Sequence, residues 1–141
     1  MKHIYFGIVA AVLLFTLQAL PQTTTSGWTV TYHLDGTTTG RSFTFTPVSD
    51  GKGTFRFPTT TRTVFPAVWA RPAPNRINFS AEVQLPVGTG TRESGALVFK
   101  GNVATNGTMS GPVVFVMDFP GPTAQYIIRT GTFTAVPLSS L

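Results

Sequence analysis

Few residues in this chain could do acid–base or metal chemistry, and they are widely spaced. His33 and Asp35 lie two positions apart beside the turn dipeptide Asp35-Gly36, so they could share one face at the end of a strand. A metal site needs several His, Cys or carboxylate ligands that converge. The only other histidine is His3, and there is no cysteine. We therefore expect His33 to be an outward polar residue, Asp35 to form a turn, and no metal to be bound.

The carboxylates suit catalysis no better. Glycoside hydrolysis needs two of them on opposite sides of a cleft, but Asp35, Asp50 and Glu93 fall in predicted turns. This leaves Glu82 on a polar strand face and Asp118 at a strand end. The chain also lacks the G-x-S-x-G motif of a nucleophile elbow and the glycine-rich motifs that cradle phosphate. The sequence predicts no catalytic residue, no cofactor and a protein that is not an enzyme.

Arginines and aromatic residues interleave with prolines between residues 58 and 76. Prolines lower the entropy that a loop loses on ordering, and Trp with Arg suits stacking on a planar, anionic or sugar-like group. The segment is predicted to cross one end of the domain, either as a ligand lid or as a plug of the core. Trp69 should then point inward, with Arg62 or Arg71 at the rim. With two aromatic residues of the first strand, the candidate ligand-binding residues are Trp28, Tyr32, Phe65, Trp69, Arg62 and Arg71.

Residues 1–26 have the features of a secretion leader. Lys2 and His3 precede an apolar run from Ile4 to Leu20, and a polar stretch follows. The run is at the lower limit of the roughly 17 to 25 apolar residues that span a bilayer, and no clean A-x-A cleavage site follows it. We expect a cleaved signal peptide, with a retained N-terminal anchor as the alternative, and a bacterial protein that is secreted or periplasmic.

Residues 27–141 have the length and composition of a single β-domain. Alternating apolar and polar residues predict strands at about 27–34, 41–47, 54–57, 77–85, 97–103, 109–117 and 125–136. Four prolines exclude a central strand from Pro58 to Asn75, where at most Thr61 to Phe65 could pair along an edge. Residues 86–94 are predicted to be a flexible turn. Gly131 is expected to mark a bulge or a bend between two short strands.

Short connections between these strands favour one architecture. It is an all-β, antiparallel up-and-down barrel of seven to eight strands after an N-terminal signal helix, with a two-sheet β-sandwich as the alternative. Eight aromatic residues are expected to line the interior: Trp28, Tyr32, Phe43, Phe45, Phe55, Phe57, Phe79 and Phe99.

Three short motifs in the C-terminal half add a resemblance. They are LVFKGNV at 97–103, TNGTMSG at 105–111 and RTGTFTA at 129–135. They resemble small secreted bacterial lipocalin-like barrel proteins, in which a strand ends in F-x-G, a turn has N-G-x-M-S-G and the chain closes with G-T-F-T-A. The resemblance implies the barrel fold. Since these motifs belong to strands and hairpins, it transfers no functional residue.

Charge and surface pattern narrow the function. The net charge is +5, but the arginines are scattered in sequence, so no nucleic-acid partner is expected. The leading hypothesis is a non-enzymatic secreted or envelope barrel that binds a small apolar or amphipathic ligand, with membrane contact only through an uncleaved N-terminal segment. The alternative is a cell-surface structural or protein-interaction module with a filled core. Val113 to Met117, which is apolar on both faces, would then form a protein contact, for example between the subunits of a homo-oligomer.

Overall fold

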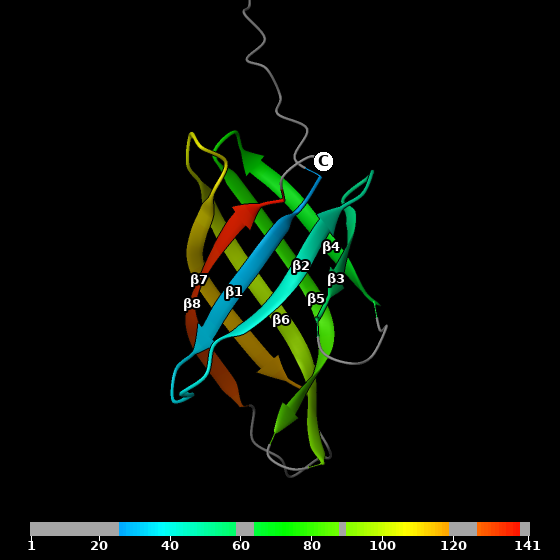
Figure 1. Ribbon diagram of the computed structural model, residues 1–141. Coiled ribbons are helices and arrows are strands. Elements are labelled where there is room, and N and C mark those ends of the chain that lie inside the picture. Colours follow the sequence, from blue (N-terminus) through cyan, green and yellow to red (C-terminus); the bar gives the residue numbers. More distant parts are fainter. Residues whose placement is uncertain (1–25, 59–63, 88–89, 119–126, 139–141) are drawn as a thin grey trace, which may run out of the picture.

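Eight antiparallel strands close into a barrel in the computed structural model, which describes residues 26–58, 64–87, 90–118 and 127–138 (Figure 1). The strands are β1 (Trp28–Leu34), β2 (Arg41–Pro47), β3 (Lys52–Arg56), β4 (Val64–Ala73), β5 (Arg76–Val87), β6 (Thr91–Val103), β7 (Met109–Met117) and β8 (Ile128–Pro137). Each strand pairs with the next, and β8 pairs with β1. The up-and-down barrel is thus confirmed and the two-sheet sandwich is wrong. The predicted signal helix lies outside the described residues.

Alternation of side chains gives the barrel its two faces. In β1, Trp28, Val30, Tyr32 and Leu34 are buried, and the threonines and His33 between them are exposed. This period of two is what a strand with one dry and one wet face requires. In the other strands, the same alternation determines whether a charged side chain points into the barrel or toward solvent.

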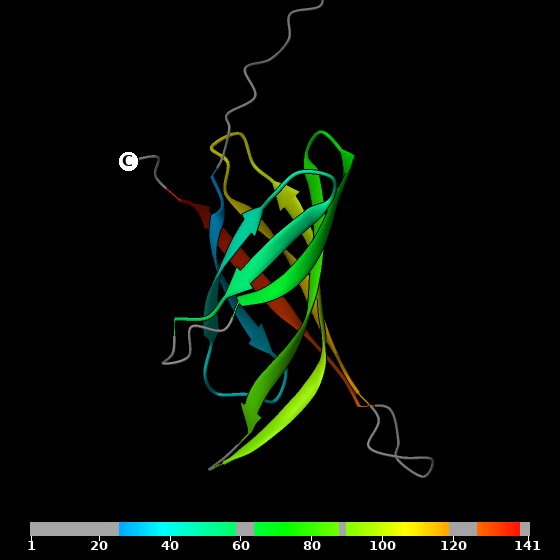
Figure 2. The same ribbon diagram turned by 90° about the vertical axis from the view of Figure 1, so that its right-hand side faces the viewer.

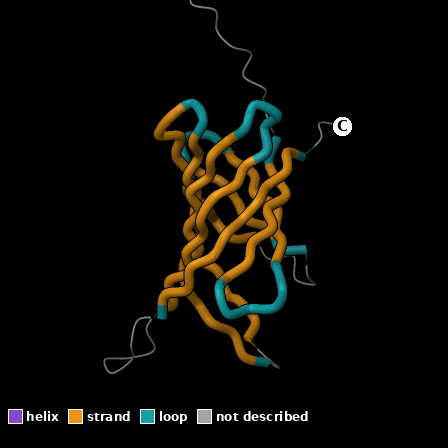
Figure 3. Tube along the Cα trace, turned by 90° about the vertical axis from the view of Figure 1, so that its left-hand side faces the viewer, coloured by secondary structure: helices purple, strands orange, loops and turns teal. Residues whose placement is uncertain are grey.

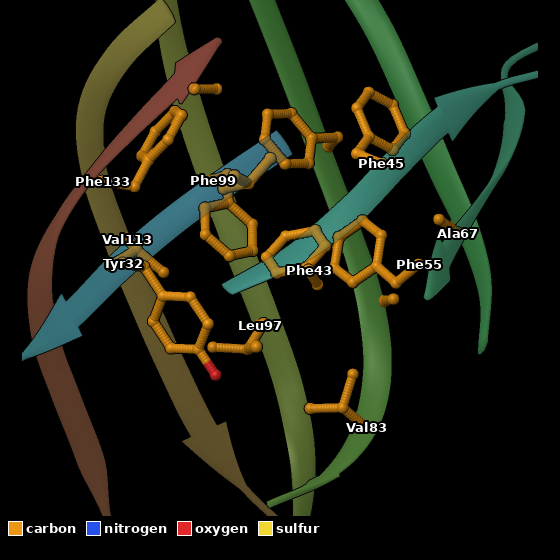
Figure 4. Packing of buried hydrophobic residues seen from close by; sticks show 14 of the residues in the cluster. Tyr32, Phe43, Phe45, Phe55, Ala67, Val83, Leu97, Phe99, Val113 and Phe133 are labelled. Carbon is orange, nitrogen blue, oxygen red and sulfur yellow. The ribbon is translucent and has the colours of Figure 1, made fainter. Parts of the chain in front are cut away.

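Aromatic rings fill the middle of the barrel (Figure 4). Phe45, Phe79 and Phe99 form a near-parallel stack, with ring centroids 4.4 and 4.7 Å apart. Phe45 comes from β2 and Phe99 from β6, so the stack joins opposite walls. Tyr32 and Phe43 also contact Phe99, at 5.8 and 5.4 Å. Of the eight aromatic residues expected inside, Phe57 alone is only partly buried.

The proline-rich segment is a strand, contrary to prediction. Residues 64–73 form β4, which pairs with β3 from Val64 to Val68 and with β5 from Ala67 to Ala73. Residues 64–73 therefore belong to the barrel wall and do not cross one end as a lid or plug, whereas residues 59–63 of the predicted segment lie outside the described residues.

The positions of the prolines explain how β4 tolerates them. Trp69 donates its backbone N–H to Gly51, on the β3 side, at 2.7 Å. Successive residues of a strand point their backbone groups to alternate sides, so Pro66 points its nitrogen toward β5. The β4–β5 ladder begins one residue later, at Ala67, and Pro72 lies in the bulge that shifts its register. Neither proline removes a required ladder bond.

Two further expectations are corrected. The predicted flexible turn at 86–94 is largely strand, because the β5–β6 ladder continues to the pair Val87 and Thr91. Figure 2 shows this hairpin extending at one end of the barrel. Gly131 lies within an uninterrupted β8, paired with Leu34 and Val113, and marks neither a bulge nor a bend. A Cβ atom there would overlap the carbonyl oxygen of His33, so the glycine allows a close approach of two backbones.

The barrel has two ends, at which successive strands are connected (Figure 3). The Trp28 end carries the β2–β3, β4–β5 and β6–β7 turns together with residues 26–27 and Leu138, whose N–H bonds to Gly27. The arginine end, named after Arg41 and Arg129, carries the other four connections. These two names are used below.

Candidate ligand-binding site

The structure does not bring the six predicted ligand-binding residues together. Trp28 closes the Trp28 end, where its ring stacks on Phe45 with centroids 5.9 Å apart. Its Nε1 donates to the carbonyl of Gly107 at 3.0 Å. This tryptophan is buried and has its hydrogen bond, so its environment is that of a core residue.

Trp69 lies near the same end and packs against the core, as the predicted inward orientation requires. Its Nε1 donates to the carbonyl of Lys52 at 2.8 Å and lies 3.3 Å from that of Val48. The indole therefore fixes the β2–β3 turn to the wall.

The remaining predicted residues divide between the two ends. Arg71 is exposed on β4 toward the Trp28 end. Phe65 is half-buried toward the arginine end, where its ring meets Phe57 edge to face at 5.8 Å. Arg62 lies outside the described residues. Only Phe65 and Tyr32 are thus placed near polar groups that face inward.

Tyr32 has an unusual environment. Its side chain points into the barrel and the residue is 1 % exposed. Figure 4 shows its hydroxyl directed away from the Phe43 and Phe99 rings. Within the described residues this hydroxyl has no hydrogen-bond partner. Burial raises the pKa of Tyr32 from 10.0 to about 12, and the positive charge of Arg41 opposes the shift. The phenol is therefore a neutral donor at all physiological pH values.

Arg41 faces the same interior, because it is the cross-strand partner of Tyr32. The last β2–β3 pair is Thr44 with Arg56, so Arg41 lies beyond the end of β3. Its Nη2 reaches the carbonyl of Pro86 on β5 at 2.6 Å. That bond uses one of the five N–H donors of the guanidinium.

A second inward arginine is already neutralised. Arg129 Nη2 lies 2.9 Å from Glu93 Oε1, with side-chain exposures of 30 % and 18 %. Both face inward, since Arg129 is opposite buried Phe115 and Glu93 is opposite buried Leu85. Glu93 Oε2 is buried and has no partner within the described residues.

Three partly buried apolar side chains lie toward the same end of the barrel. Phe57, Phe65 and Met117 are only partly buried and pack against the core. We call the whole set the arginine-end cup: Tyr32, Arg41, Glu93, Arg129, Phe57, Phe65 and Met117. The cup combines a free donor, a free acceptor, an unneutralised guanidinium and apolar surface.

An open hollow of about 450 Å³ lies beside the cup on the β5–β6 side. Phe65 and Val83 line it together with polar side chains that include Gln84, Arg92 and Asp118. Gln84 and Arg92 are exposed, so this hollow is wet and belongs to the outer surface.

Arg41, Glu93 and Arg129 were not predicted as site residues. Strand periodicity contained the signal, because each has the parity of buried neighbours: Arg41 with Phe43 and Phe45, for example. Glu93 was missed because residues 86–94 were predicted to be a turn. A charged residue at an inward position near a strand end is the pattern that would have found all three.

The predicted protein contact, Val113 to Met117, lies in β7. In β7, Val113 and Phe115 are buried, while Val114 and Val116 are half-buried on the outer face. Val116 is paired with Ile128, which is 59 % exposed. The strand is thus apolar on both faces, as predicted.

The described residues contain no group of three or more His, Cys, Asp or Glu side chains that could hold a metal ion. Within the same part of the chain, no helix is long and apolar enough to cross a membrane. Comparison with known proteins gave no match to a family model, to a curated protein or to a solved structure.

Proposed function

We propose that this protein is a non-enzymatic secreted or envelope barrel that binds a small amphipathic molecule with an anionic head group at the arginine-end cup. The observation that carries the proposal is the buried Tyr32 hydroxyl, which has no partner within the described residues and lies opposite Arg41.

An unpartnered buried hydroxyl is costly. Leaving such a group unsatisfied costs about 1 to 3 kcal/mol. A carboxylate or another anionic acceptor at the cup would accept a hydrogen bond from the Tyr32 hydroxyl and so remove that cost. The raised pKa keeps the proton available for this bond.

The charges favour an anion over a cation. Arg129 is paired with Glu93, whereas the bond that Arg41 makes is to a neutral carbonyl. Among the described residues, Arg41 therefore has no carboxylate partner and keeps unused donors, which suits bidentate binding of a carboxylate.

The filled core sets the depth of the site. Because the stack of Phe45, Phe79 and Phe99 joins opposite walls, an apolar chain has no space in the middle of the barrel. The tail would lie on the half-buried surfaces of Phe57 and Phe65. The ligand is thus expected to be short, and to be held at the mouth.

Isothermal calorimetry with decanoate and with uncharged 1-decanol tests the proposal. Decanoate should bind more tightly than the alcohol, and Arg41→Gln should weaken it by roughly 10- to 100-fold, the loss of a charged hydrogen bond worth about 1.5 to 3 kcal/mol. Arg71→Gln is the matched control and should leave binding unchanged, since Arg71 is exposed and lies toward the opposite end of the barrel. Failure of both probes to bind more tightly than about 1 mM would rule the function out.

A second candidate function, association with another copy of the chain, is favoured by the outer face of β7. Val114 and Val116 pair there with Val98 and Ile128, forming an uncharged aliphatic strip across three strands. Sedimentation of wild type and of Val116→Lys tests this candidate. Self-association that the substitution abolishes supports it, and a monomer at every concentration excludes it.

A further inference from the structure

We infer that the Trp28 end of the barrel docks on a membrane surface rich in anionic lipid. The inference is independent of the ligand proposed above and concerns the opposite end of the molecule. It rests on charge, on exposed apolar side chains and on where the chain enters the barrel.

The barrel is basic in one half only. The arginines and lysines look scattered in sequence, but the fold gathers four exposed ones toward the Trp28 end: Lys52, Arg71, Arg76 and Lys100. Asp50 is the single acidic residue of that half. In the described residues of the other half, the numbers of basic and acidic side chains are equal. The four basic residues are Arg41, Arg56, Arg92 and Arg129, and the four acidic residues are Asp35, Glu82, Glu93 and Asp118. The excess positive charge of the described barrel therefore lies at the Trp28 end.

Two of these cations, Arg76 and Lys100, are neighbours on the outer wall. Lys100 is paired with Asn78, two residues from Arg76 on the same face of β5, so Arg76 and Lys100 are diagonal neighbours. Such neighbours lie about 7 to 8 Å apart. Like charges at this spacing repel, and an anionic surface relieves that repulsion.

Exposed valines accompany the charges. Val68 is the cross-strand partner of Lys52 and is 61 % exposed, and Val48 in the adjoining turn is 53 % exposed. The Trp69 indole holds this turn through the carbonyls of Lys52 and Val48. Basic and apolar side chains on one rigid rim suit the interface between lipid head groups and acyl chains.

The chain reaches the barrel from this end. Ser26, the first described residue, precedes β1 at the Trp28 end (Figure 1). The apolar run from Ile4 to Leu20 lies a few residues before it in sequence. Wherever that run is held in a membrane, the basic end is the part of the barrel next to the lipid, and the arginine-end cup faces away.

Site-specific labels on the full chain can test the docking, because the sequence has no cysteine. Thr105→Cys and Thr38→Cys place an environment-sensitive fluorophore at exposed turns of the Trp28 end and the arginine end. Quenching by lipid-borne nitroxides is measured for vesicle-bound protein on neutral phosphatidylcholine and on vesicles with about 30 % phosphatidylglycerol. The neutral vesicles report the effect of the N-terminal tether alone.

We expect the quenching at Thr105 to rise at least about threefold on the anionic vesicles, to return to the neutral level near 1 M salt, and to stay unchanged at Thr38. Each basic side chain near an anionic surface contributes about fivefold, or roughly 1 kcal/mol. The variant R76Q/K100Q should therefore lower the docking equilibrium constant by about 25-fold. The control R56Q/R92Q, which removes the same charge from the other half, should not lower it.

Three results would overturn the inference. One is equal quenching at Thr105 on neutral and anionic vesicles, and another is an equal effect of the two double variants. The third is binding of a labelled oligothymidylate that is as tight as binding to the vesicles and is lost in R76Q/K100Q. That result would show that these cations bind polyanions in general.

Discussion

At the scale of single residues, the interior polar groups are the informative ones. Tyr32, Arg41 and Glu93 occupy inward positions that the alternation of their strands reserves for apolar side chains. Core packing gives no reason for the Tyr32 hydroxyl, since a buried polar group without a partner lowers stability and this one has none within the described residues. A binding function is best argued from polar residues at such inward positions.

Tyr32 gives a pH-dependent prediction. Its pKa is 10.0 when unfolded and about 12 when folded. Between these values the folded protein keeps the phenolic proton that the unfolded chain has lost, so this contribution is fully present below pH 10 and is lost as the pH rises toward 12. The free energy of unfolding should fall by up to about 3 kcal/mol over this window.

Urea unfolding at pH 9 and pH 12 measures this loss, and Tyr32→Phe serves as the reference. The variant lacks the titrating group, so its free energy of unfolding should fall by up to about 3 kcal/mol less than that of the wild type. Parallel losses in the two proteins would show that the Tyr32 hydroxyl is not buried.

At the scale of elements, β4 shows where sequence reasoning succeeds and fails. The strands from Trp28 to Leu34 and from Met109 to Met117 were predicted closely, because alternation and turn residues agree there. The sequence does not predict β4, because prolines such as Pro66 and Pro72 argue against a central strand. Whether a proline nitrogen faces a ladder bond depends on register and bulges, which are set by partner strands far away in sequence.

Trp69 tests the role of β4. Trp69→Phe keeps the ring in the wall but removes the indole donor to the carbonyls of Lys52 and Val48. We expect a loss of about 1 to 2 kcal/mol in the free energy of unfolding, with decanoate binding unchanged. Val68→Thr, on the exposed face next to it, should change stability by less than about 0.5 kcal/mol. A loss of decanoate binding in Trp69→Phe would restore Trp69 as a ligand contact.

Gly131 tests the pairing of β8 with β1. Gly131→Ala places a methyl group against the carbonyl of His33, so the two strands must separate. Overpacking of this kind costs about 1 to 3 kcal/mol or more. The exposed neighbour Thr132→Ala should cost under about 1 kcal/mol. Equal melting temperatures for the two variants would contradict the close approach of the strands.

At the scale of the whole molecule, a filled barrel separates stability from function. The aromatic stack is the part that composition and alternation predicted best, since every expected ring faces inward. Whether those rings leave a cavity depends on how side chains from opposite walls interlock, which local patterns do not determine. The cup as a whole was not predicted, although Tyr32 and Phe65 were. Its members come from β1, β2, β4, β6, β7, β8 and the residue after β3, so they meet only when the barrel closes.

The stack also predicts the distribution of stability. Phe99→Ala removes the ring that contacts Phe79, Phe43 and Tyr32. The free energy of unfolding should fall by about 3 to 5 kcal/mol. Val98→Ala, one residue away on the outer face, should cost under about 1.5 kcal/mol in the same urea titration. Similar costs for both would show that the rings do not form one packed core.

The most direct test of the account is a titration of the ¹⁵N-labelled protein with decanoate, followed by NMR amide shifts. Perturbations should be confined to the arginine end, with the largest near Tyr32, Arg41 and Phe65, and they should vanish in Arg41→Gln. The amides of Trp28 and Phe45 at the other end should not move. Shifts centred on Trp28 and Phe45, or none at millimolar decanoate, a free energy of about −4 kcal/mol, would contradict the placement of the ligand site.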